Sequence, residues 1–96
     1  MPVYFIAQVE IHDSAGYERY TREAAAAGMP PGMKLLAMDE KPTLLEGKWH
    51  GPKTVVLEFP DEAALRKWYD SPAYQAAAKF RWGATISNVA VIHGMP

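Results

Sequence analysis

The chain of 96 residues contains no cysteine. Disulfides, thiolate nucleophiles, zinc–thiolate sites and iron–sulfur clusters are therefore all excluded. An excess of charge of one sign is also missing, because 10 lysine and arginine residues stand against 11 aspartate and glutamate residues, a formal net charge of -1. Such a balance gives no electrostatic reason to expect nucleic acid or an anionic membrane as a partner.

Long apolar runs are lacking as well. The N-terminal residues include no basic segment followed by an apolar stretch, and no apolar run approaches the roughly 18 residues that a membrane span requires. We therefore expect neither a signal peptide nor a membrane span, and we expect a cytoplasmic location. The length suits one compact domain, which we place over residues 1–96.

The first half of the chain shows clear periodic patterns. Apolar residues alternate through Val3–Ile11, which is typical of a strand. Asp13 or Ser14 can cap a helix predicted over Ser14–Ala27, and Gly28 can end it. A Pro-Pro-Gly breaker follows, and the sequence then predicts a second extended region over residues 33–38 and 42–46.

The second half repeats this alternation of elements. After a loop at residues 47–52, Lys53–Phe59 reads as a third strand, which Pro60 stops. A helix capped by Asp61 is predicted next. Ser71 and Pro72 then predict a second cap with proline at the first helical position, which starts a separate short helix over 73 to about 80, and a last strand follows over 88–93. This order predicts a ferredoxin-like βαββαβ fold of the α+β class, in which two helices cover one face of an antiparallel four-stranded sheet.

The predicted sheet has a second face that no helix covers. Its side chains mix apolar and charged groups, which is too apolar for open water and too polar for a sealed core. A second copy of the chain that closes over this face explains the mixture most simply, so we expect a homodimer with facing sheets and a cavity between or beside them. The residues expected there are Tyr4, Ile6, Gln8, Glu10, Leu44, Glu46, Val56, Glu58, Asn88, Ala90 and Ile92.

Glu58 is the most informative polar residue, because it interrupts an apolar strand. We expect the first and third strands to run parallel, so that Glu10, His12 and Glu58 gather at one end. Glu58 would then act as a carboxylate base, with His12 as a possible proton relay and Arg81 stabilising an anion or enolate. In the competing interpretation Glu58 and Arg81 form an ion pair that only fixes the fold or the dimer.

Candidate ligand contacts are Glu46, Trp49, Tyr4, Glu10 and Tyr69. Trp49 lies in a glycine-flanked loop and suits ligand contact or interface packing equally. Tyr69 and Trp68 read first as core residues of their helix. Glu46 is expected to end the second extended region.

Metal, cofactor and RNA sites are not expected. The predicted topology places His12 and His93 at opposite ends of the sheet, and no metal-binding histidine spacing occurs. Phosphate-binding and dinucleotide-binding glycine motifs are absent. RNA-recognition domains share this fold, but the open face of the third strand would present Glu58, which repels phosphate.

Several sequence blocks resemble one known family. They are Leu-Glu-Gly-Lys-Trp at 45–49, Val-Val-Leu-Glu-Phe-Pro at 55–60, Trp-Tyr-Asp-Ser-Pro-Ala-Tyr-Gln at 68–75, and Arg81. In this order they resemble the domain-of-unknown-function family 1330 of the dimeric α/β-barrel superfamily, which also contains cofactor-free monooxygenases and small-molecule isomerases. The resemblance implies the fold and the dimer. Two functions stay open: a cofactor-free binder or enzyme for a small organic molecule, and a non-catalytic structural or accessory dimeric module.

Overall fold

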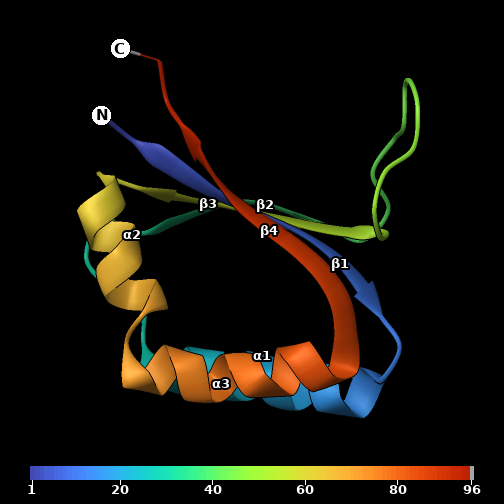
Figure 1. Ribbon diagram of the computed structural model, residues 1–96, viewed down its shortest axis with the longest axis horizontal. Coiled ribbons are helices and arrows are strands. Elements are labelled where there is room, and N and C mark those ends of the chain that lie inside the picture. The colour runs from blue at the N-terminus through green and yellow to red at the C-terminus, as the bar shows by residue number, and fades with distance from the viewer. Residues whose placement is uncertain (96) are drawn as a thin grey trace.

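The computed structural model describes residues 1–95. Its elements in chain order are β1 (Val3–Ile11), α1 (Ser14–Ala27), β2 (Lys34–Asp39), β3 (Lys53–Phe59), α2 (Glu62–Tyr69), α3 (Pro72–Ala84) and β4 (Thr85–His93). The strands form one four-stranded sheet in the order β2-β3-β1-β4. All of the helices lie on one side of this sheet (Figure 1). The predicted ferredoxin-like α+β fold is therefore confirmed.

The sheet is antiparallel throughout, including the central pair β1 and β3. The expectation that these two strands run parallel is wrong. The crossover through α1 returns the chain in the direction of β1, so β2 has that direction and β3, which turns back from β2, opposes it. The register of β1 on β3 accordingly pairs Val3 with Phe59 and Val9 with Lys53.

The second extended region is shorter than predicted. Strand β2 ends at Asp39, which pairs with Thr54. Residues 42–46 form no strand, because Pro42 lacks a backbone N–H and β3 has no further residues to offer them. Residues 40–52 instead form a projection, which we call the arm, on the side of the sheet away from the helices (Figure 1).

Local capping explains where the helices begin. Asp13 accepts a hydrogen bond from the backbone N–H of Gly16, and Asp61 accepts one from that of Ala64. Helix α3 begins with the predicted Ser71 cap and Pro72 but runs on to Ala84, beyond the predicted end. Thr85 then adopts an extended conformation and opens β4 directly, with no intervening loop.

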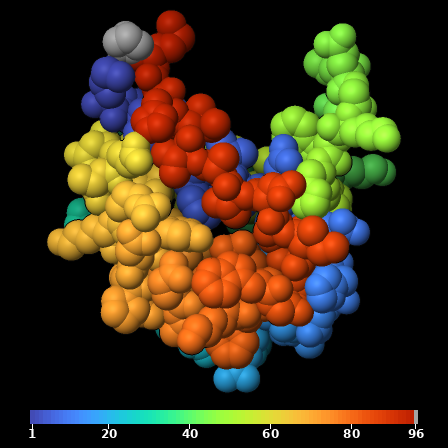
Figure 2. Space-filling model, in the orientation of Figure 1, coloured from blue at the N-terminus to red at the C-terminus, as the bar shows by residue number. Residues whose placement is uncertain are grey.

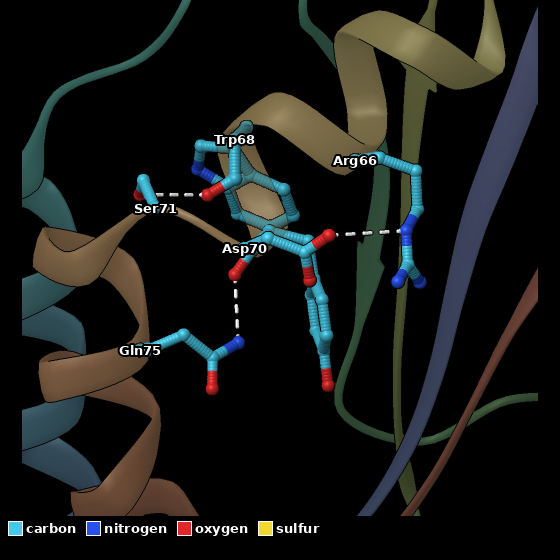
Figure 3. Close-up of polar contacts among 6 residues, drawn as sticks. Arg66, Trp68, Asp70, Ser71 and Gln75 are labelled. Atoms are coloured by element: carbon cyan, nitrogen blue, oxygen red, sulfur yellow. Dashed lines mark hydrogen bonds and ion pairs between the residues drawn. The ribbon is translucent and has the colours of Figure 1, made fainter.

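The corner between α2 and α3 is held by polar contacts (Figure 3). The Ser71 hydroxyl donates to the carbonyl of Trp68 at 2.8 Å, and the Gln75 side chain donates to the carbonyl of Tyr69 at 2.7 Å. Arg66 and Asp70 form an ion pair at 3.2 Å along α2. These contacts fix the direction in which Trp68 and Tyr69 leave the helix.

The core lies between the sheet and the helices. Its strand residues are the inward set Val3, Phe5, Ala7, Val9, Leu57 and Phe59, as the alternation predicts. Trp68 packs edge-on against Phe5 at 5.4 Å between ring centroids and lies 4.2 Å from the ring of Tyr74. Trp68 and Tyr69 are half-buried against this core, so their interpretation as core residues is confirmed. Across residues 1–95, none of the helices has the length and apolar character needed to cross a membrane.

Candidate functional site

The open face of the sheet is organised in cross-strand rows. Each row runs from β2 through β3 and β1 to β4, and the pairing of strands defines its members. The three rows are Lys34, Glu58, Tyr4, Ile92; then Ala37, Val56, Ile6, Ala90; then Asp39, Thr54, Gln8, Asn88. An apolar row therefore lies between a row with an ion pair and a fully polar row.

Glu58 is directly opposite Tyr4 on β1 and opposite Lys34 on β2. Its carboxylate lies 3.6 Å from the Lys34 ammonium, with side-chain exposures of 22% for Glu58 and 69% for Lys34. The acid on the open face thus has a partner, but one whose own side chain remains largely in water. Such an exposed pair contributes little free energy and can open.

The expected grouping of Glu58 with His12 and Arg81 does not form within one chain. His12 follows the end of β1, whereas Glu58 pairs with Tyr4 near its start. Glu10 pairs with Ile86 at the His12 end, so it is also remote from Glu58. Both corrections follow from the antiparallel pairing of β1 and β3, which places the end of β3 beside the beginning of β1.

Arg81 lies on the other side of the sheet. It belongs to α3, where its side chain is 3% exposed, and the carboxylate of Glu58 pairs instead with Lys34. The predicted Glu58–Arg81 ion pair is therefore wrong, because residues of β3 alternate and Glu58 points away from the helices that carry Arg81.

Three other predicted residues gather around the arm. Glu10 and Trp49 line a hollow of about 390 Å³ with Lys41 and Gly51. Trp49 also lines a hollow of about 310 Å³ with Glu46, and its indole N–H donates to the Thr54 hydroxyl at 2.9 Å. Glu46 lies in the arm and does not end a strand, contrary to the prediction.

The hollowed outer surface continues along β1 and β4. A depression of about 250 Å³ is lined by Ile6, Gln8, Asn88, Val89, Ala90 and Ile92. In the space-filling view, the arm rises on one side of the molecule and the start of β1 and the end of β4 rise on the other, with a hollow between them (Figure 2). The open face is therefore a broad trough with raised ends.

The helix side holds a polar cluster that the sequence did not reveal. The hydroxyls of Tyr20 on α1 and Tyr74 on α3 are 2.8 Å apart. The guanidinium carbon of Arg81 lies 5.5 Å from the centroid of the Tyr20 ring. The seven-residue spacing of Tyr74 and Arg81 along one helix was a signal that both face the same way, but nothing in the spacing identified Tyr20 as their partner.

The ionisation of this cluster follows from its burial. Burial raises the pKa of Tyr74 well above its usual range, and Tyr20 adds to the effect. Burial by itself opposes the charge on Arg81, but the neighbouring oxygens of Tyr74 and Tyr20 outweigh it, so the pKa of Arg81 is raised. At neutral pH the cluster therefore contains a permanent cation beside a neutral Tyr74 phenol.

Tyr69 also lies on the helix side, away from the other predicted ligand contacts. It lines a small hollow of about 160 Å³ with Phe5, Leu65 and Val91. Among residues 1–95, no three histidine, aspartate or glutamate side chains come close enough together to hold a metal ion.

Comparison with protein families identifies the chain. Residues 2–95 match the model of a domain of unknown function, DUF1330, and the chain belongs to that family. A search of curated proteins finds no match.

Several solved structures share the fold. RPA0582, a protein of unknown function from Rhodopseudomonas palustris, has a TM-score of 0.80 at 19% identity over 99% of this chain and 83% of its own. A dimeric ferredoxin-like protein of unknown function from Jannaschia has a TM-score of 0.76 at 16% identity over 98% and 100%. SnoaB, a cofactor-independent oxygenase from Streptomyces nogalater, has a TM-score of 0.67 at 19% identity over 99% and 94%. At these identities the similarity establishes the fold alone.

Proposed function

We propose that this protein is a homodimer with facing sheets that binds a small organic molecule in the trough between them, without a cofactor. The observation that carries the proposal is the apolar middle row of the open face, flanked by polar rows. Ile92 is 51% exposed at its border although it is a large aliphatic side chain. Apolar surface of this kind marks a binding surface.

A second copy of the chain is the occupant that fits this face best. A face-to-face pair joined by a two-fold axis needs a self-complementary surface, and an apolar row with a polar row on either side satisfies that condition. The raised arm and the raised start of β1 and end of β4 would enclose the partner from both sides. The Jannaschia protein, which has the same fold, is dimeric.

Glu58 is the proposed proton acceptor of the enclosed site. It lies beside Tyr4, and its pair with the exposed Lys34 can open when a ligand arrives. A two-fold axis that runs across the strands would bring the arm end of one copy over the Glu58 end of the other. Glu10, His12, Glu46 and Trp49 of that second copy would then supply the remaining proposed contacts.

SnoaB, a cofactor-independent oxygenase, has the same fold as this protein. This similarity favours a function that needs no bound cofactor. The protein framework would supply orientation and proton transfer to a reactive organic molecule. A non-catalytic dimeric module is the second candidate. The existing Lys34–Glu58 ion pair favours it, because a paired carboxylate needs no ligand to explain its presence.

The test is a thermal-shift screen of small phenols, enolisable ketones and organic acids, followed by measurement of binding to variants. Glu58→Gln should abolish binding of any hit and leave the dimer intact. Glu62→Gln, which changes an exposed acid on α2 that pairs with His93, is the matched control and should bind normally. If Glu58→Gln binds every hit as well as the original protein does, the site is not at Glu58 and the non-catalytic module is favoured.

A further inference from the structure

We propose that the arm of each copy completes the site of the other copy, with Glu46 of the arm paired with Lys34 of the second copy. Because this arrangement needs two copies with facing sheets, it rests on the proposed function. It specifies which segment the second copy contributes, where that segment lies on the open face, and which surface a ligand beside Glu58 would meet.

The arm carries apolar side chains that the fold of one chain leaves in water. Leu45 is 89% exposed, and Leu44 and Trp49 are also exposed. These three side chains line a hollow of about 310 Å³ together with Pro42, Thr43 and Glu46. Contiguous apolar surface of this kind is typical of a surface that another body covers.

The direction and the reach of the arm favour a second copy as that body. The arm rises on the side of the sheet away from the helices, so only a body that lies on the open face can meet it (Figure 1). Two sheets that pack face to face lie about 10 Å apart. Each leg of the arm has about six residues and can extend at most about 20 Å. The arm of one copy is therefore long enough to reach the sheet of the other.

The strand pairing determines where the arm would arrive. The arm joins the end of β2 to the start of β3, next to the pair of Asp39 with Thr54. The pair of Lys34 with Glu58 marks the opposite end of the same two strands. A two-fold axis that runs across the strands exchanges the two strand ends but keeps each strand over its own counterpart. The arm of one copy therefore comes over Lys34 and Glu58 of the other.

The charges at the two places are complementary. Near its tip the arm carries Glu46 and Lys48, which are exposed and take no part in the ion pairs within residues 1–95. The end of the row that they would meet carries Lys34 and Glu58, with the Lys34 side chain 69% exposed. The Lys34 ammonium has three N–H donors, so it can hold Glu58 of its own chain and Glu46 of the second copy together. Such complementary charges fix the register of two surfaces.

This arrangement also specifies the surface that a ligand would meet. The apolar hollow of the arm, lined by Leu44, Leu45 and Trp49, would face Glu58 and its neighbour Tyr4. A ligand between them would lie against apolar side chains on one side and a carboxylate on the other. The class that fits is a small organic molecule with an apolar body and a hydroxyl that can donate to Glu58, such as a phenol or an enol.

The test uses the lack of cysteine in the chain, because any introduced thiol can pair only with another introduced thiol. The variant with both Lys34→Cys and Glu46→Cys should form a disulfide-linked dimer under mild oxidation, seen on a non-reducing gel. The two positions cannot link within one chain, because β3 has seven residues and separates them by about 20 Å, whereas a disulfide needs α-carbons within about 7 Å. Lys34→Cys alone and Glu46→Cys alone should give no linked dimer, because the axis places the two copies of each residue at opposite ends. Lys34→Cys with Glu23→Cys, on an exposed position of α1, is the matched control and should not link either.

Sedimentation equilibrium of the unaltered protein separates this inference from the proposed function. If the protein is a dimer but the double variant gives no more linked product than Lys34→Cys alone, the arm does not reach Lys34 and this inference fails by itself. Linked product from Glu46→Cys alone would mean that the two arms meet each other, which would also overturn it. If the unaltered protein sediments as one chain and no variant links, both proposals fail.

Discussion

The two faces of the sheet are built from the same strands but differ in which polar and apolar groups they bury and expose. The helix face is sealed by aromatic and aliphatic groups, with Phe59 fully buried, yet the helices above it enclose the charged Arg81. The open face carries the ion pair of Glu58 with Lys34 in water, yet it leaves Ile92 half exposed. Each face thus contains a group that folding alone would place on the other. Such exceptions to the rules of folding are expected at functional or strained sites.

The largest expected effect is a difference in stability between substitutions on the two faces of one strand, β3. Phe59→Ala should lower the free energy of unfolding by about 3–5 kcal/mol, because it leaves a cavity in the sealed core. Val56→Ala, three residues earlier on the open face, should cost about 1 kcal/mol or less where the chain is monomeric. Urea titrations at low protein concentration measure the free energy of unfolding of both variants. Equal losses would mean that the open face is as well packed as the core.

A smaller effect is expected inside the helix layer. Tyr74→Phe removes the buried hydroxyl that contacts Tyr20 at 2.8 Å, and it should cost about 1 kcal/mol. The Tyr20→Phe variant and the double variant complete a cycle that isolates the pair. Additive losses in that cycle would show that the two hydroxyls do not interact.

The stability of the fold at alkaline pH should depend on buried groups on the helix side of the sheet. Lys53 is buried, pairs with Glu40 at 3.2 Å and lies 4.7 Å from the centroid of the Tyr17 ring. Burial by itself lowers the pKa of Lys53, but Tyr17 and Glu40 together raise it above the ordinary 10.5. Because the pKa of Lys53 is higher in the folded chain, its charge stabilises the fold fully at pH values below its pKa in the unfolded chain. This stabilisation is lost as pH rises through the pKa in the folded chain.

Tyr74 acts in the same direction. Its pKa is raised by burial, so the unfolded chain releases that proton first and stability falls as pH rises beyond the ordinary 10.0. Urea midpoints measured through this alkaline range should therefore decline, and the decline should be shallower in Lys53→Met and in Tyr74→Phe. If both substitutions leave the pH profile unchanged, the pKa values of Lys53 and Tyr74 are not raised in the folded chain.

The smallest effect is expected for the open-face acid. Glu58→Gln removes an ion pair with an exposed partner, so it should change the free energy of unfolding by less than about 0.5 kcal/mol. Urea unfolding of this variant beside Glu62→Gln measures it. A loss several times larger would mean that Glu58 has a structural role that its pairing with Lys34 does not explain.

Local patterns in the sequence predicted most of the fold. The alternation of Val3–Ile11 gave the inward and outward sets of β1 correctly, because burial on one face imposes a period of two. The caps Asp13, Asp61 and Ser71 also begin their helices as predicted. These features depend on neighbours in the chain, so the sequence is sufficient to find them.

The errors concern relations between distant segments. The relative direction of β1 and β3 follows from how α1 returns the chain, and mistaking it moved Glu58 to the wrong end of the sheet. Arg81 was assigned to Glu58 because the segment entering the last strand was expected to reach the same end of the sheet, whereas its neighbours are Tyr20 and Tyr74. The strand expected over 42–46 failed because no partner strand extends that far. None of these relations has a periodic signal.

The central claim is that a second copy of the chain covers the open face of the sheet. Sedimentation equilibrium across a wide range of protein concentrations tests this claim most directly. We predict a mass of twice 10.7 kDa that Ile6→Asp, in the apolar middle row, reduces to that of one chain. Met29→Asp, an equally drastic change to an exposed apolar residue on the helix side, should leave the larger mass unchanged. A mass of one chain for the unaltered protein at every concentration would contradict the prediction.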